Sequence, residues 1–155
     1  MTLNINQFSQ SAIQGMVDLR FGGAVVSCQI DVSSGGALPP GQAVKVVDSA
    51  GGVPKVVECA ADTDEVFGFI AYDQIHPTFD AYDPCQVALV NGGAAMFMTA
   101  SAAIARNAVV TIVTASDKVK TSTGGSRDVG RAYDKAALDG DLIRVLLLPK
   151  TTVTA

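Results

Sequence analysis

The chain has 155 residues, a formal net charge of −4 and 48% hydrophobic residues. This length favours one domain with a substantial apolar core, and the hydrophobic content excludes an intrinsically disordered chain. The Lys and Arg residues are scattered without a basic stripe, which argues against nucleic acid as a partner.

Residues 1–21 are predicted to form an extended N-terminal arm. They are rich in Gln, Asn and Ser, with isolated apolar side chains between them. This pattern is too polar for a core and too apolar for a solvated spacer, so we expect an arm that becomes ordered on a partner. A frayed terminus is the alternative. The candidate contact residues of the arm are Leu3, Ile5, Phe8, Ile13, Met16 and Leu19.

Residues 22–155 are predicted to form one β-rich domain, because short β-branched segments alternate with Gly- and Pro-rich turns. Asn-Gly-Gly at 91–93 is the strongest hairpin signal, and it is expected to join the strands on either side. Short helical turns are predicted at 99–107 and 134–140. The fold class is therefore all-β, a small barrel or sandwich. Strands are predicted at 22–32, 43–48, 53–59, 66–73, 85–90, 94–99, 109–114, 118–122 and 142–148.

One phrase occurs twice, as VFGFIAYD at 66–73 and DVGRAYD at 128–134. Each copy follows a strand and a hairpin, so the sequence indicates a degenerate internal repeat, about 41–73 and 107–134. Glycine inside a strand marks a bend or the close approach of another backbone. Gly68, Tyr72, Gly130 and Tyr133 are therefore assigned to the scaffold rather than to an active site.

Residues 84–105 carry no charge, which raises the question of a membrane span. Asn-Gly-Gly interrupts this stretch, and most of its residues are small rather than large and apolar. We therefore expect no membrane partner.

Catalytic and metal-binding patterns are weak. His76 is the only histidine, and it lies beside Pro77, ahead of Thr78 and Asp80. A Cys–His nucleophile pair stays an alternative, but nothing in the local sequence supports it. Two acidic groups lack the later ligands of a calcium loop, so we predict no catalytic residue, cofactor or metal site. The cysteines show no C-x-x-C spacing and are expected to be buried free thiols. The acidic groups are Asp62, Asp64 and Glu65, and Asp139 and Asp141; the cysteines are Cys28, Cys59 and Cys85.

Four segments in a fixed order resemble the capsid cement (decoration) proteins of tailed bacteriophages. The resemblance covers residues 22–149, and its elements are weakly specific one at a time. Many such sequences have glycine where this chain has Asn107, and asparagine tolerates the same left-handed backbone geometry. The segments are GALPPGQAVKVVDSAGGVPKV, AADTDEVFGFIAYD, TASAAIARNAVVTIV and GRAYDKAALDGDLIRVLLLP.

The resemblance implies a non-enzymatic β-rich protein, made in the host cytoplasm and bound as a homotrimer to the outer face of the virion capsid. Its partner there would be the major capsid protein, whose neighbouring subunits it clamps. Three weak footprints on one trimer act together as a strong one. Two alternatives stay open: another β-type virion protein, from the tail or the head–tail joint, or a small β-barrel enzyme or ligand-binding module that uses His76.

Overall fold

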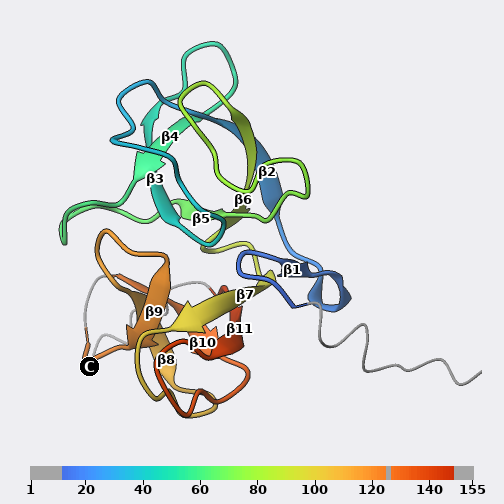
Figure 1. Ribbon diagram of the computed structural model, residues 1–155, viewed down its shortest axis with the longest axis vertical. Helices are drawn as coiled ribbons and strands as arrows, with labels where there is room; N and C mark the ends of the chain where they lie inside the picture. The colour runs from blue at the N-terminus through green and yellow to red at the C-terminus, as the bar shows by residue number, and fades with distance from the viewer. Residues whose placement is uncertain (1–11, 125–126, 149–155) are drawn as a thin grey trace, which may run out of the picture.

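The computed structural model describes residues 12–124 and 127–148, and in this part of the chain it contains strands and one 3-10 turn but no α-helix. Two small barrels lie one above the other (Figure 1). The predicted all-β class is confirmed. Barrel 1 consists of β2 (Val25–Ile30), β3 (Ala43–Asp48), β4 (Lys55–Glu58), β5 (Gly68–Ile70) and β6 (Pro84–Leu89). Barrel 2 consists of β7 (Ala95–Ala100), β8 (Val109–Ile112), β9 (Lys118–Thr121), β10 (Asp128–Ala132) and β11 (Leu142–Leu146).

The two barrels share one strand order and one register. In each, the first strand pairs antiparallel with the fifth and parallel with the third, and the second strand pairs antiparallel with the third and the fourth. In each, the fourth strand also pairs antiparallel with the fifth. The parallel contact joins Ile30 to Val56 in barrel 1 and Ala100 to Val119 in barrel 2. Paired residues of one barrel therefore have positional equivalents in the other, apart from the register shifts at Val46–Asp48 and Asp128–Gly130.

The repeated phrases lie at equivalent places, on β5 and β10. A Cβ atom on Gly68 would lie 2.3 Å from the carbonyl oxygen of Ala88, and one on Gly130 would lie 1.9 Å from that of Leu146. Ala88 and Leu146 are themselves equivalent positions on β6 and β11. Both glycines thus allow the neighbouring strand to approach closely.

The tyrosines of the two phrases do not hold equivalent positions. The backbone amide of Tyr133 donates to the carbonyl of Arg144 at 2.9 Å, and the corresponding amide in barrel 1 belongs to Ala71, which donates to Gln86 at 2.8 Å. Tyr72 is the next residue along the chain, and its amide instead donates to Gly15.

Position 107 has the geometry that its asparagine suggested. Asn107 has φ 66°, and Gly41, with φ 85°, occupies the same place in barrel 1. The amide of Asn107 donates to Ala132, and that of Gly41 donates to Ile70 at the equivalent site. Asparagine therefore supplies the left-handed residue that precedes β8.

Two local predictions are wrong. Asn-Gly-Gly at 91–93 does not close a hairpin, because β6 belongs to barrel 1 and β7 to barrel 2. Its backbone instead bonds to both barrels: Gly92 accepts from Ala24, and Gly93 donates to Leu147. The helical turns predicted at 99–107 and 134–140 are also absent, because Ile104 and Ala136 pair with each other in an antiparallel β-bridge.

The apolar core has two parts. The smaller cluster fills barrel 1 and includes Ile30, Val44, Ile70 and Val87. The larger cluster fills barrel 2 and also takes in side chains that point outward from barrel 1. These are Ala43, Cys59, Phe69, Ala71 and Ala88.

Candidate functional site

The chain before barrel 1 is docked on both barrels. Strand β1 (Val17–Asp18) pairs with β7, and the 3-10 turn η1 (Leu19–Phe21) follows it. The amide of Gly15 donates to Phe97 of barrel 2 at 2.7 Å, and its carbonyl accepts from Tyr72 beside barrel 1 at 2.8 Å. The described end of the expected arm, from Gln14 to Phe21, thus lies against the barrels.

The six candidate contact residues of the arm differ in where they lie. Leu3, Ile5 and Phe8 lie outside the described residues. Ile13 is exposed, Met16 is half-buried, and Leu19 begins η1. Of the two candidates whose burial is described, Ile13 is therefore more accessible to a partner than Met16.

Arg144 on β11 fixes this segment to barrel 2. Its Nε and Nη2 each donate to the carboxylate of Asp134 at 2.8 Å, a two-point contact that holds the guanidinium plane. Its Nη1 reaches Oδ2 of Asp18, the buried residue of β1, at 3.5 Å. Arg20 closes the cluster with a 2.6 Å bond from its Nη2 to the same oxygen of Asp18.

These contacts shift the acid–base properties of both carboxyl groups. The hydrogen bond from Arg20, with a smaller contribution from Arg144, lowers the pKa of Asp18 to about 2 against the opposing effect of burial. The hydrogen bonds from Arg144 lower the pKa of Asp134. Both aspartates therefore stay ionised at neutral pH and hold the segment as charged partners.

An aromatic pair covers the outer side of this cluster. Phe21 and Tyr133 meet edge to face with ring centroids 5.2 Å apart, and the guanidinium carbon of Arg144 lies 4.5 Å from the centre of the Tyr133 ring. Both rings stay partly exposed. The surface of barrel 2 thus presents aromatic side chains held in fixed orientations by a cation.

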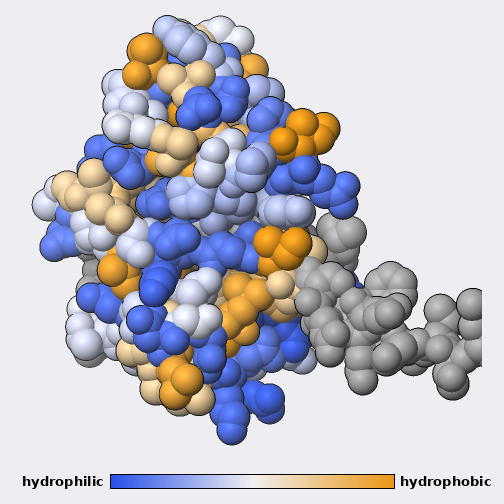
Figure 2. Space-filling model, viewed as in Figure 1, coloured by the Kyte–Doolittle hydropathy of each residue, from blue (hydrophilic) through white to orange (hydrophobic). Residues whose placement is uncertain are grey.

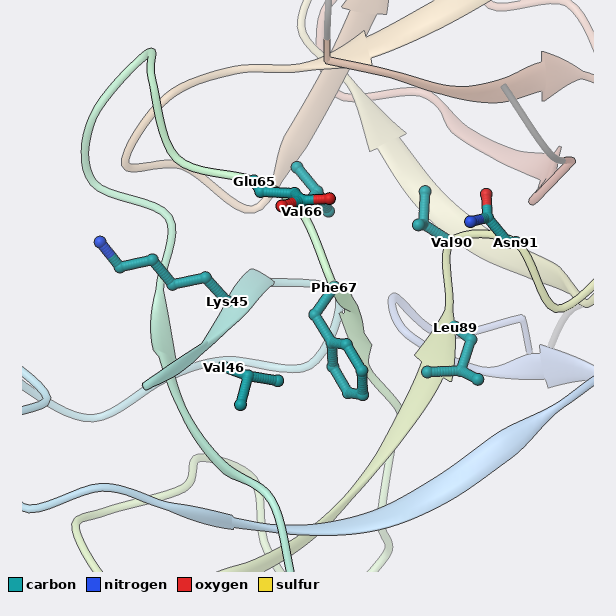
Figure 3. Close-up of a pocket in the computed structure, with 8 residues that line it drawn as sticks. All are labelled: Lys45, Val46, Glu65, Val66, Phe67, Leu89, Val90 and Asn91. Carbon is teal, nitrogen blue, oxygen red and sulfur yellow. The ribbon is translucent and has the colours of Figure 1, made fainter. Parts of the chain in front are cut away.

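A second feature is the hollow at one end of barrel 1, which we call the mouth of barrel 1. Val46, Phe67 and Leu89 point toward one another there, with Glu65 and Asn91 at the rim (Figure 3). The hollow has a volume of about 450 Å³. Val46 is 39% exposed, an unusual value for an apolar residue two positions from the buried Val44. The mouth is an open apolar cavity with a polar rim.

His76 has a local structural partner. Its Nδ1 lies 2.9 Å from Oδ2 of Asp73, and its ring stacks on Phe79 with centroids 5.6 Å apart. The hydrogen bond to Asp73 raises the pKa of His76. Both contacts of the histidine ring are thus made within its own loop.

The cysteines are buried and unpaired, as predicted. Burial raises the pKa of Cys85 to about 12 and that of Cys59 to about 11, so neither thiol is activated. The sequence did not indicate that Cys28 and Cys85 lie opposite each other on β2 and β6. Across the described ranges no group of His, Cys, Asp and Glu side chains could hold a metal ion, and no helix there is long and apolar enough to cross a membrane.

Sequence reasoning also missed the cluster around Arg144. Asp134 belongs to the repeated phrase, and Arg144 lies in the closing strand, but Asp18 is 126 positions away from Arg144. Nothing in the spacing of the sequence links residues so far apart.

Comparisons with known proteins find likenesses among solved structures. No family model and no curated protein matches the chain. A crystal structure described as the head fiber gp8.5 N base in bacteriophage phi29 shares the fold, with a TM-score of 0.54 and 16% sequence identity. The match covers 79% of this chain and 93% of that one. At this identity the likeness shows a shared fold and nothing about function.

Proposed function

We propose that this chain is a non-enzymatic structural protein of a bacteriophage head, which decorates the outer face of the capsid. The observation that carries the proposal is the shared fold with a phage head fiber base over 93% of that protein. The sequence resemblance to capsid cement proteins points to the same place in the virion by an independent route.

The proposed partner is the major capsid protein, bound by homotrimers that clamp neighbouring subunits. Multivalent contact requires a rigid body, and two barrels joined through one apolar cluster supply it. Exposed apolar side chains form several separate patches among hydrophilic residues on the face shown in Figure 2. Such small patches suit a set of modest contacts.

The test uses empty capsids of the parent virus that lack this chain. We expect the purified chain to sediment with them saturably and to raise the temperature at which they disrupt. A variant without residues 1–11 tests the arm, since those residues precede the docked segment; lost binding with unchanged folding would assign capsid contact to the arm. Absence of binding by the intact chain would refute the proposal.

A second role is favoured by the description of the structural neighbour. The chain could serve as the base of a fiber that projects from the head, with one end on the capsid. Electron microscopy of the decorated capsids distinguishes the two roles: a decoration protein covers many lattice positions with low caps, whereas a fiber base supports a projection that extends outward.

A further inference from the structure

The contact between the two barrels has two different halves. One half is the outer row of barrel 1, where Ala43, Phe69 and Ala88 lie side by side on neighbouring strands and point away from the barrel. The other half is the mouth of barrel 2, formed by Ile112, Val129 and Leu147. All six side chains are at most 4% exposed and belong to one apolar cluster. The outward-pointing row of barrel 1 is thus buried in the same apolar cluster as the three residues at this end of barrel 2.

Each half has an uncovered equivalent elsewhere in the chain. The residues equivalent to Ile112, Val129 and Leu147 are Val46, Phe67 and Leu89, which line the mouth of barrel 1. Phe67 and Leu89 are partly exposed and Val46 more so, although their counterparts are buried. Barrel 1 therefore keeps an open end of the kind that is closed in barrel 2 (Figure 3).

The outer row of barrel 2 is the second uncovered equivalent. Val109, Arg131 and Leu146 occupy the positions of Ala43, Phe69 and Ala88 and are likewise neighbours across strands. Arg131 is exposed, and Val109 and Leu146 are half-buried. Beside them Tyr133, the equivalent of the buried Ala71, is exposed. The row of barrel 2 that is equivalent to the buried row of barrel 1 is thus partly exposed, with Phe21 and Arg144 packed against Tyr133 at its side.

We propose that a second copy of the chain places the outer row of its barrel 2 over the mouth of barrel 1. This contact repeats between chains the one that joins the barrels within a chain. We assign the contact to a second copy because every chain carries both surfaces, the mouth on barrel 1 and the outer row on barrel 2.

Charges at the two surfaces support this assignment. Within the chain, the rim of barrel 2 carries Arg127, whose Nη1 lies 3.2 Å from Oδ1 of Asp62 on barrel 1. The equivalent rim residue of barrel 1 is Glu65, three positions before the repeat glycine in the same way. Between copies the rim is acidic and the incoming row carries Arg131. Neither Glu65 nor Arg131 forms an ion pair with another described residue. Arg131 donates one hydrogen bond, from Nη1 to the carbonyl of Asn107 at 3.0 Å, and its other guanidinium N–H groups are left to meet Glu65.

The two halves differ from each other, so the contact is heterologous: it can close into a ring or extend as a chain. A homotrimer would be one closed ring of such contacts. The inference concerns contact between copies and does not depend on whether the protein binds a capsid, so it can be tested on the purified chain alone.

The test uses two variants that each remove one half. Val46→Asp places a charge in the mouth, and Arg131→Glu reverses the charge of the row; both positions are exposed, so folding should be kept, and thermal unfolding verifies this. In sedimentation velocity, we expect the unmodified chain to associate and each variant alone to do so at least tenfold more weakly. Lys135→Glu, with the same charge change at another exposed site of barrel 2, is the matched control and should associate normally.

Mixing the two variants is the decisive step. Val46→Asp keeps an intact row and Arg131→Glu keeps an intact mouth, so the mixture should form a one-to-one dimer and stop there. The double variant Glu65→Arg with Arg131→Glu should recover association. A monomeric unmodified chain at all accessible concentrations, normal association of Arg131→Glu, or a mixture that stays monomeric would overturn the inference.

Discussion

Replacing Gly130 by alanine tests the close approach of β10 and β11. A Cβ atom at this position would lie 1.9 Å from the carbonyl oxygen of Leu146, and Cβ contacts below 3.0 Å essentially never occur. The strands must therefore separate by about 1 Å, and the obstacle is a backbone atom that no side-chain rotation can move. Overpacking of this kind costs about 1–3 kcal/mol, and a rigid obstacle places Gly130→Ala at about 3 kcal/mol. For a chain of this size, that corresponds to a fall in Tm of roughly 6–12 °C.

The equivalent change in barrel 1 gives an internal comparison. Gly68→Ala meets the carbonyl oxygen of Ala88 at 2.3 Å, so a smaller displacement and a loss of about 2 kcal/mol are expected. Gly36→Ala is the control, because a Cβ there has no atom within 4 Å and the backbone needs no positive φ; we expect a change below about 0.5 kcal/mol. Thermal and urea unfolding measure all three. A Gly130→Ala variant as stable as the Gly36→Ala control would refute the reasoning.

Three further predictions rest on single positions. Tyr82 has φ 71° where the equivalent turn of barrel 2 has Gly140, so Tyr82→Gly should raise stability by about 0.5 kcal/mol in urea unfolding, and a loss of stability would contradict this. The folded pKa of Asp18 is about 2 against 3.8, so its contribution is complete above about pH 4 and is lost as the pH falls toward 2. Asp18→Asn should therefore flatten the stability–pH curve between pH 4 and 2, and an unchanged slope would count against the cluster. The pKa of His76 is raised, so its ion pair stabilises below pH 6.5 and fades as the pH rises through the folded pKa. An NMR titration should show this pKa fall in Asp73→Asn, and unchanged capsid binding by His76→Ala would leave the enzyme alternative without support.

The strands were predictable because their signals are local. The segments 43–48, 109–114 and 118–122 are short, contain β-branched residues and are bounded by turn signals, and the structure places β3, β8 and β9 within them. Gly68 and Gly130 were also recognisable as positions of close backbone approach, since glycine within a strand has few other uses.

The errors arose where long-range contacts outweigh local preference. Asn-Gly-Gly at 91–93 has the composition of a hairpin turn, but Ala24 and Leu147 provide its hydrogen-bond partners and draw the two flanking strands into different barrels. The segment around Ile104 has a helical composition, but its backbone bonds reciprocally to Ala136. Neither partner is identifiable from one sequence without knowledge of the barrels.

The candidate site was less predictable for the same reason. The apolar arm residues suggested contact with a partner. The mouth of barrel 1, however, is made from three strands, and the cluster around Arg144 joins residues that are 126 positions apart. Exposed apolar residues at these places become visible only when the two barrels are compared position by position. The sequence repeat pointed to that comparison without giving its register.

The pairing of β1 with β7 has a consequence for the order of events during synthesis. Barrel 1 is contiguous in sequence and has its own apolar cluster, so it can close while the ribosome is still making barrel 2. Strand β1 can pair only after Met96 of β7 has been made, and Asp18 can form its ion pair only after Arg144 has been made. Strand β1, the earliest of the described strands in the sequence, is therefore fixed only after its partners in barrel 2 have been made.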